Sequence, residues 1–368
     1  MNRIDTVYQL GNLVFALSGE DQVLPHLREE LKSIEIKDNK RPALIFRFGK
    51  VLRNLDNGVY ASPVICTENE VLCAISGYFY RVSRENDALI VDIQSNAIGV
   101  KRRMFPTIAK IRDWNFLLPQ EQLAKNFMYD VFDYLTQIQN LGLRQSYVHA
   151  SSFTRGDRAV AVVAWGGIGK TTSMLKLVTE DNWKFLSDDL GLVDEDGVIY
   201  RSPKKMQIYA YNVEGQPKLK NMLLRDRPMV DMLNWYYRKA RFGIKKVRRR
   251  VSAEELFKEK VGVSDGLTDV LFIERAAVKD FETHAITVGE LASKAASTVM
   301  REIDPYHTIM SAIYSVQTKC IIPPYEEVHG KTKQVLAKAF SSTSPLLIKI
   351  PLSASPDELA DFLRGLLR

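Results

Sequence analysis

The segment from Ala159 to Thr172 constrains the fold more than any other part of the chain. It reads Ala-Val-Ala-Val-Val-Ala-Trp-Gly-Gly-Ile-Gly-Lys-Thr-Thr, an apolar run followed by a glycine-rich turn. A continuous apolar run of this kind is typical of a central strand that is buried on both faces. The glycines permit a tight turn, and a helix that follows it directs its positive end at the same place. The segment therefore predicts a strand, an anion-binding loop and a helix.

The residues around the glycines indicate that the anion is a polyphosphate. The pattern is a Walker A motif in which Ala164 replaces the usual first glycine. Lys170 would place a positive charge near the β- and γ-phosphates of ATP, and the Thr171 hydroxyl would ligate the accompanying Mg²⁺. A glycine-rich turn without a ligand is the alternative, but it leaves the order Gly-Lys-Thr-Thr unexplained. The predicted nucleotide-binding residues are Gly166, Gly167, Ile168, Gly169, Lys170, Thr171 and Thr172.

Two adjacent acids follow a short apolar strand that begins at Trp183. These are Asp188 and Asp189. In a doubly wound sheet the carboxyl ends of the strands line the ligand crevice, so we expect the pair to face the phosphates. One carboxylate would help to hold Mg²⁺, and the other would accept a proton from an attacking hydroxyl. A solvated Asp-Asp turn is the alternative.

A histidine upstream completes a longer pattern. His149 lies 21 residues before Lys170, and the run from Arg155 to Arg158 predicts a hairpin turn between them. The order of histidine, two strands, Gly-Ile-Gly-Lys-Thr, helix, and strand ending in Asp-Asp resembles the HPr kinase/phosphorylase family. Members of that family are P-loop kinases that phosphorylate serine hydroxyls, and they are related to phosphoenolpyruvate carboxykinase.

The resemblance implies roles for individual residues. The catalytic residues would be His149, Lys170, Asp188 and Asp189, with Asp189 as the general base toward a hydroxyl and His149 hydrogen-bonded within the carboxylate cluster. The metal ligands would be Thr171, Asp188 and Glu214. The family's downstream signature for the reverse reaction is not recognisable here. The resemblance also implies a homo-oligomer, since the family forms hexamers.

The length of 368 residues and the hydrophobic content of 46% predict two domains. We expect a small α+β domain over residues 1–112, a connecting segment and helix over 113–140, and an α/β nucleotide-binding domain of HPr-kinase/phosphoenolpyruvate-carboxykinase type over 141–368. Pro119 is expected near the start of the connecting helix, and Pro356 near the start of the last helix.

The number and spacing of the cysteines and histidines indicate the redox state of the compartment and whether a structural metal is expected. The chain has three cysteines and five histidines, and neither set shows metal-ligand spacing. We therefore expect a reducing cytoplasm and no structural zinc. No apolar stretch has the length of a membrane span, so no membrane partner is expected.

A basic run extends from Arg238 to Arg250, with eight lysines and arginines and no acid. Such a run repels itself, so we predict an exposed or partly mobile segment that either remains a solvated surface or orders over an anionic ligand. Trp235, Tyr236 and Tyr237 lie nearby, yet no nucleic-acid-binding signature accompanies them, and nucleic acid is not the expected partner.

Two functional classes fit these observations. The favoured one is an ATP- and Mg²⁺-dependent phosphotransferase that acts on a serine or threonine hydroxyl of a protein, peptide or small molecule. The alternative is a P-loop ATPase that acts as a switch or as a regulator that binds nucleic acid or another partner, without phosphotransfer, with Glu274 as the metal-side or water-activating carboxylate. The element that selects guanine, Asn-Lys-x-Asp, is absent.

Overall fold

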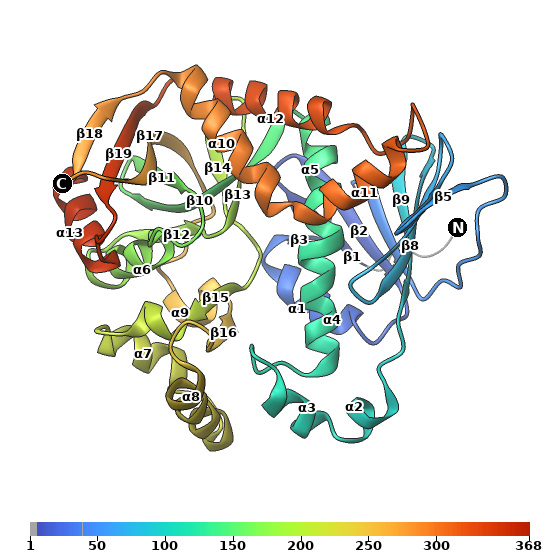
Figure 1. The fold of residues 1–368 in the computed structure, drawn as a ribbon, viewed down its shortest axis with the longest axis horizontal. Coiled ribbons are helices and arrows are strands. Elements are labelled where there is room, and N and C mark those ends of the chain that lie inside the picture. The colour runs from blue at the N-terminus through green and yellow to red at the C-terminus, as the bar shows by residue number, and fades with distance from the viewer. Residues whose placement is uncertain (1–5, 39) are drawn as a thin grey trace. The chain divides into compact units, whose positions relative to one another are not determined.

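The computed structural model describes residues 6–38 and 40–368, and the chain divides into two compact units (Figure 1). The first comprises Met1–Ala109, Leu117–Gln145 and Ile303–Thr332, and the second comprises Lys110–Phe116, Ser146–Glu302 and Lys333–Arg368. Residues 303–332, which the sequence placed with the nucleotide-binding domain, thus group with the first unit. The reason is that α11 (Asp304–Tyr314) packs against β6 and η2 of that unit.

The first unit is built on a nine-stranded sheet of order β3-β1-β2-β4-β9-β8-β7-β6-β5. Its strands are β1 Thr6–Leu10, β2 Leu13–Gly19, β3 Glu35–Ile36, β4 Leu44–Phe48, β5 Val59–Ala61, β6 Val64–Cys66, β7 Val71–Ile75, β8 Tyr78–Glu85 and β9 Ala88–Ser95. Parallel pairs join β2, β4 and β9, and the remaining pairs are antiparallel.

A long helical segment packs on this sheet through aromatic side chains. The Phe127 ring lies 5.2 Å from that of Phe46, and the Phe132 ring lies 5.3 Å from that of Phe15. Pro119 occupies the first position of the segment, as predicted. The helices of the unit are α1 Leu24–Leu31, η1 Lys32–Ile34, α2 Val100–Met104, α4 Pro119–Phe127, η2 Met128–Phe132, α5 Asp133–Gly142 and α11, while α3 Pro106–Arg112 crosses into the second unit.

The second unit contains a mixed sheet, which has both parallel and antiparallel strand pairs. Strand β11 pairs antiparallel with β10 and parallel with β17, which in turn pairs parallel with β19. The strands of this sheet are β10 Gln145–Arg155, β11 Arg158–Ala164, β12 Lys184–Ser187, β13 Leu190–Asp194, β14 Val198–Tyr200, β17 Ser264–Ala276, β18 Glu282–Ala285 and β19 Ser344–Pro351, while β15 Met206–Tyr209 and β16 Arg248–Val251 form a separate two-stranded sheet. The combination of mixed sheets and helices confirms the predicted α/β class.

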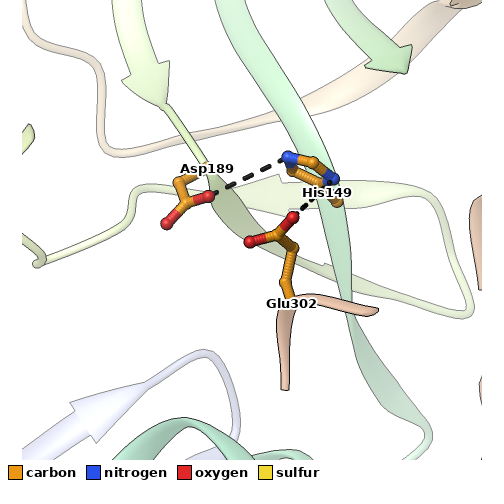
Figure 2. A group of neighbouring side chains, drawn as sticks. All are labelled: His149, Asp189 and Glu302. Atoms are coloured by element: carbon orange, nitrogen blue, oxygen red, sulfur yellow. Dashed lines mark ion pairs between the residues drawn. The ribbon is translucent and has the colours of Figure 1, made fainter. Parts of the chain in front are cut away.

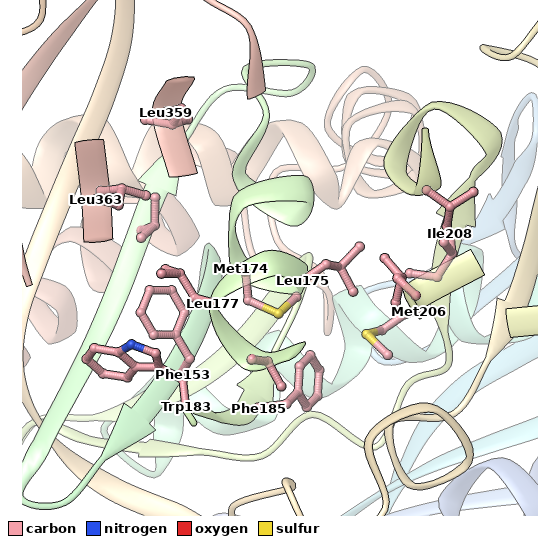
Figure 3. Close-up of a cluster of buried hydrophobic side chains, with 14 of the residues drawn as sticks. Phe153, Met174, Leu175, Leu177, Trp183, Phe185, Met206, Ile208, Leu359 and Leu363 are labelled. Carbon is pink, nitrogen blue, oxygen red and sulfur yellow. The ribbon is translucent and has the colours of Figure 1, made fainter. Parts of the chain in front are cut away.

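Strand β11 is buried on both faces, as its apolar run predicted. Val160 and Val162 belong to one hydrophobic cluster with α6 and α13 (Figure 3), whereas Ala161 and Val163 belong to a second cluster with α10 and α12. This alternation fixes β11 between two helical layers. The helices of the unit are α6 Lys170–Glu180, η3 Ala210–Val213, α7 Pro217–Leu224, α8 Met229–Phe242, α9 Ala253–Phe257, α10 Val288–Glu302, α13 Pro356–Leu366 and the end of α12 Tyr325–Ala339.

The basic run corrects one sequence prediction. The run was expected to be exposed as a whole, but only residues 240–243, 245 and 246 are exposed, whereas Arg238, Arg249 and Arg250 are buried. Arg249 pairs with Asp231 through a 2.8 Å hydrogen bond from its Nε, and Arg238 donates to the backbone carbonyl of Asp113 over 2.6 Å. Much of the charge that was predicted to face an anionic ligand therefore has partners within the unit.

None of the helices in residues 6–38 and 40–368 is long and apolar enough to cross a membrane.

Candidate phosphoryl-transfer site

The predicted loop joins the end of β11 at Ala164 to the start of α6 at Lys170. Gly167 and Gly169 have φ values of 78° and 114°, which side-chain-bearing residues rarely adopt. A Cβ at Gly169 would also lie 3.3 Å from a Pro356 side-chain carbon. No side chain caps the start of α6, so its first N–H groups stay available to an anion.

Lys170 is buried at the base of this loop. Its Nζ donates to the carbonyl oxygens of Ala164 and Trp165, over 2.6 and 3.2 Å, and lies 3.2 Å from Nε2 of His149. Burial lowers the pKa of Lys170 to about 8, although Asp188 and Asp189 oppose that shift. The ammonium is therefore held within the loop by backbone oxygens, in an environment that favours a further anionic partner.

Asp188 and Thr171 form a compact set of oxygens. The Thr171 hydroxyl donates to the Asp188 carboxylate over 3.0 Å, and the Ser151 hydroxyl donates to it over 2.6 Å. Burial raises the pKa of Asp188, while these hydrogen bonds oppose the increase. Carboxylate and hydroxyl oxygens are hard ligands of the kind that Mg²⁺ prefers. The donor set at Thr171 and Asp188 thus fits the metal that the sequence predicted.

Like Asp188, Asp189 is partly exposed, and its side chain is 35% accessible to solvent. Its φ of 72° lies in the left-handed region, which is uncommon for a non-glycine residue and is frequent at functional sites. Its carboxylate lies 3.9 Å from His149 Nε2 and 3.9 Å from Lys204 Nζ. The chain therefore presents side by side one carboxylate that accepts from two hydroxyls and one whose charged neighbours lie 3.9 Å away.

His149 lies on β10 between two acids, as Figure 2 shows. Burial and the nearby Lys170 charge lower its pKa to about 3, so the ring is neutral at pH 7. A neutral ring that accepts from Lys170 at Nε2 carries its proton on Nδ1, and Nδ1 lies 3.6 Å from a Glu302 carboxylate oxygen. Glu302 thus faces the protonated nitrogen.

Sequence reasoning missed Glu302. It is the last residue of α10, where an acid is an ordinary surface residue, and no motif connects it to His149. Ligand atoms of His149, Asp189 and Glu302 all lie within 4.8 Å of one another, so this group could hold a divalent cation (Figure 2). Burial raises the pKa of Glu302, and the Asp189 charge raises it further.

Glu214 does not join this cluster. Its half-exposed side chain pairs with Lys239 at 2.7 Å. The η3 segment before it does approach α6, because Asn212 Nδ2 donates to the Thr172 hydroxyl over 2.8 Å. The contacts that the structure gives for Glu214 include neither Thr171 nor Asp188, so its predicted role as a metal ligand has no support in this geometry.

Comparisons with known proteins add little to this description. No protein-family model matches the chain, and no curated protein matches it. Among solved structures, the Hpr(Ser) kinase/phosphatase from Coxiella burnetii aligns with a TM-score of 0.28 and 10% sequence identity, over 60% of this chain and 96% of that one. A score of this size does not establish a common fold, so functional inference depends on the chain's own residues.

Proposed function

We propose that the protein is an ATP- and Mg²⁺-dependent kinase that transfers a phosphoryl group to a serine or threonine hydroxyl of a protein, peptide or small molecule. The observation that supports this proposal is that five side chains of suitable chemistry lie together at the amino end of α6. They are Lys170, Thr171, Asp188, Asp189 and His149. His149 comes from β10, Lys170 and Thr171 from the first turn of α6, and the two acids from the turn after β12.

Asp188 and Asp189 would have different roles in this reaction, because their surroundings differ. Asp188 already accepts hydrogen bonds from Ser151 and Thr171, so it holds position and orients ligands. Asp189 is accessible and is therefore the group that can accept the hydroxyl proton of an acceptor. General-base assistance of this kind contributes roughly 10²- to 10⁴-fold to a rate.

Lys170 and the loop supply positive charge for the phosphates. The ammonium can exchange its bonds to the Ala164 and Trp165 carbonyls for phosphate oxygens without leaving the loop. Thr171 and Asp188 would hold Mg²⁺, which supplies charge neutralisation to a bound triphosphate. His149 separates Lys170 from Glu302, which limits direct pairing of the ammonium with that acid.

The position of Glu274 favours the kinase over the P-loop ATPase. Glu274 lies near the end of β17, and its carboxylate pairs with Lys294 at 3.3 Å. In the ATPase proposal this acid would serve the metal or activate water, yet the contacts described for it do not reach Thr171 or Asp188. Asp189 lies in the turn after β12, 3.9 Å from His149 Nε2, where the kinase proposal needs its base.

The test compares Asp189→Asn with Glu274→Gln. Both proteins and the wild type are incubated with γ-labelled ATP and Mg²⁺ in lysate of the source cell, and labelled species are identified. Binding of Mg²⁺-ATP is measured by calorimetry on the same proteins. We expect Asp189→Asn to keep ATP binding and to lose at least about 100-fold in labelling rate, because the base is gone.

Asp226→Asn is the matched control, since Asp226 is exposed and pairs with its neighbour Arg225 at 3.5 Å. It should label at the wild-type rate. Unchanged labelling by Asp189→Asn would contradict the assigned base. Steady ATP hydrolysis that survives Asp189→Asn but is lost in Glu274→Gln would replace the kinase proposal with the ATPase.

A further inference from the structure

A cavity of about 330 Å³ opens beside the predicted phosphate loop. This volume lies at the lower end of the range for small-molecule pockets, roughly 300 to 1,000 Å³. The loop, the end of β17 and α10 provide its walls. Residues that line it include Trp165, Ile168, Phe272, Ile273, Glu274 and Lys294. The lining combines apolar and aromatic side chains with polar and charged ones, among them also Arg275, Ser297 and Thr298, which suits an organic group that carries polar atoms.

The loop and the cavity share two residues. Trp165 accepts a hydrogen bond from Lys170 through its carbonyl oxygen, while its side chain lines the cavity. Ile168 also lines the cavity, and its carbonyl oxygen accepts from Arg275 Nη2 over 3.4 Å. Arg275 additionally donates to the Ala354 carbonyl over 2.8 Å, which ties this wall to the chain before α13. A ligand in the loop would therefore border the cavity directly.

The cavity and the acid pair lie on opposite sides of β11. Strand β11 pairs with β10 on one side and with β17 on the other. Asp188 and Asp189 follow β12, which pairs with β10, whereas the cavity lies at the end of β17. A polyphosphate in the loop would thus have the reacting acids toward one side and the apolar cavity toward the other.

We propose that the cavity binds the purine base of a nucleoside triphosphate, with the Trp165 ring stacked on the base. This inference rests on the proposed function and assigns a binding site to the base of its nucleotide, which a base-free polyphosphate would leave empty. The Trp165 side chain is 54% exposed, so its ring face is accessible to a ligand. Glu274 and Lys294, 3.3 Å apart, offer an acceptor and a donor to the polar edge of a base.

Calorimetry with Mg²⁺-ATP and with Mg²⁺-tripolyphosphate tests the proposal, because tripolyphosphate has the phosphates and lacks the base. Wild type should bind ATP more tightly than tripolyphosphate. Stacking of a base on an aromatic ring implies that Trp165→Ala weakens ATP binding roughly 5- to 150-fold. Tripolyphosphate affinity should stay unchanged in this variant, and Trp165→Phe should retain most of the ATP affinity.

Trp114→Ala is the matched control, because Trp114 is a partly exposed tryptophan of the same unit outside the cavity lining. It should bind both ligands as the wild type does. Equal affinity of the wild type for ATP and tripolyphosphate would overturn the proposal, as would an equal loss of both ligands in Trp165→Ala. Absence of binding of either ligand to the wild type would instead overturn the proposed function itself.

Discussion

Replacing Asp231 with Asn removes the counter-charge of a buried guanidinium. The side chains of Arg249 and Asp231 are only 2% and 4% exposed, and Arg249 Nε donates to an Asp231 carboxylate oxygen over 2.8 Å. Burial lowers the pKa of Arg249, and the Asp231 charge opposes that shift. Removal of one partner from a buried ion pair costs about 3 to 5 kcal/mol. Asn retains one acceptor oxygen, so we expect about 3 kcal/mol.

The free energy of unfolding is measured by thermal and urea denaturation of the full chain, followed by tryptophan fluorescence. Trp235 is a suitable reporter, because its ring lies 5.1 Å from the Arg249 guanidinium. A loss of about 3 kcal/mol lowers the melting temperature by roughly 6 to 12 °C for a unit of this size. Asp226→Asn serves as the control, since its exposed pair with Arg225 is worth less than about 1 kcal/mol.

Two results would refute this reasoning. The first is an Asp231→Asn protein that unfolds at the same temperature as Asp226→Asn, which would mean that the pair is accessible to water. The second comes from the double variant Asp231→Leu with Arg249→Met. Apolar replacement of both partners removes the burial cost of both charges, so the double variant should be more stable than Asp231→Asn. A double variant less stable than the single one would contradict that account.

Two further predictions concern charge in the second unit. Lys170→Met should abolish tripolyphosphate binding at pH 7 by calorimetry without lowering the melting temperature, because burial already disfavours the Lys170 ammonium. Burial raises the pKa of Asp269, but the hydrogen bonds from Arg158 and Thr268 together with the Arg158 charge more than offset this, and the pKa lies below its usual value. The stability that this pair contributes is therefore present above about pH 4 and lost as the pH falls through the folded-state pKa. Arg158→Leu should show a smaller loss of stability between about pH 4 and pH 2 than the wild type in acid-unfolding measurements; an identical pH dependence would contradict the assignment.

Short-range patterns predicted the elements that carry the site. The apolar run before Ala164, the three glycines and the Lys-Thr pair led to β11, the loop and the start of α6, and the structure has all three. Ser355 caps α13 by accepting from the Glu358 N–H over 3.2 Å, as the Ser-Pro start of that helix indicated. These features depend on backbone conformations and hydrogen bonds that span only a few residues.

Such short-range patterns did not predict contacts between residues that are far apart in the sequence. Glu302 reaches His149 only because α10 packs across the sheet that contains β10, and its position at a helix end gave no signal. Glu214 was predicted to be a metal ligand from the resemblance to the family's order of motifs, whereas its carboxylate pairs with Lys239 in the structure. The roles of His149, Lys170, Asp188 and Asp189 remain predictions, although the structure brings these side chains together.

The sequence by itself determined the glycine-rich bend, its lysine and hydroxyl, and the acids that follow the next strand, because backbone freedom and side-chain chemistry are properties of the residues in order. Only the tertiary structure decided which charges are enclosed. Arg249, which belongs to the basic run, is buried because Asp231 of α8 pairs with it. The Trp165 indole borders a cavity because β17 and α10 supply the other walls. Burial and electrostatic partnership depend on surfaces brought together by the whole chain, and the order of residues does not specify them locally.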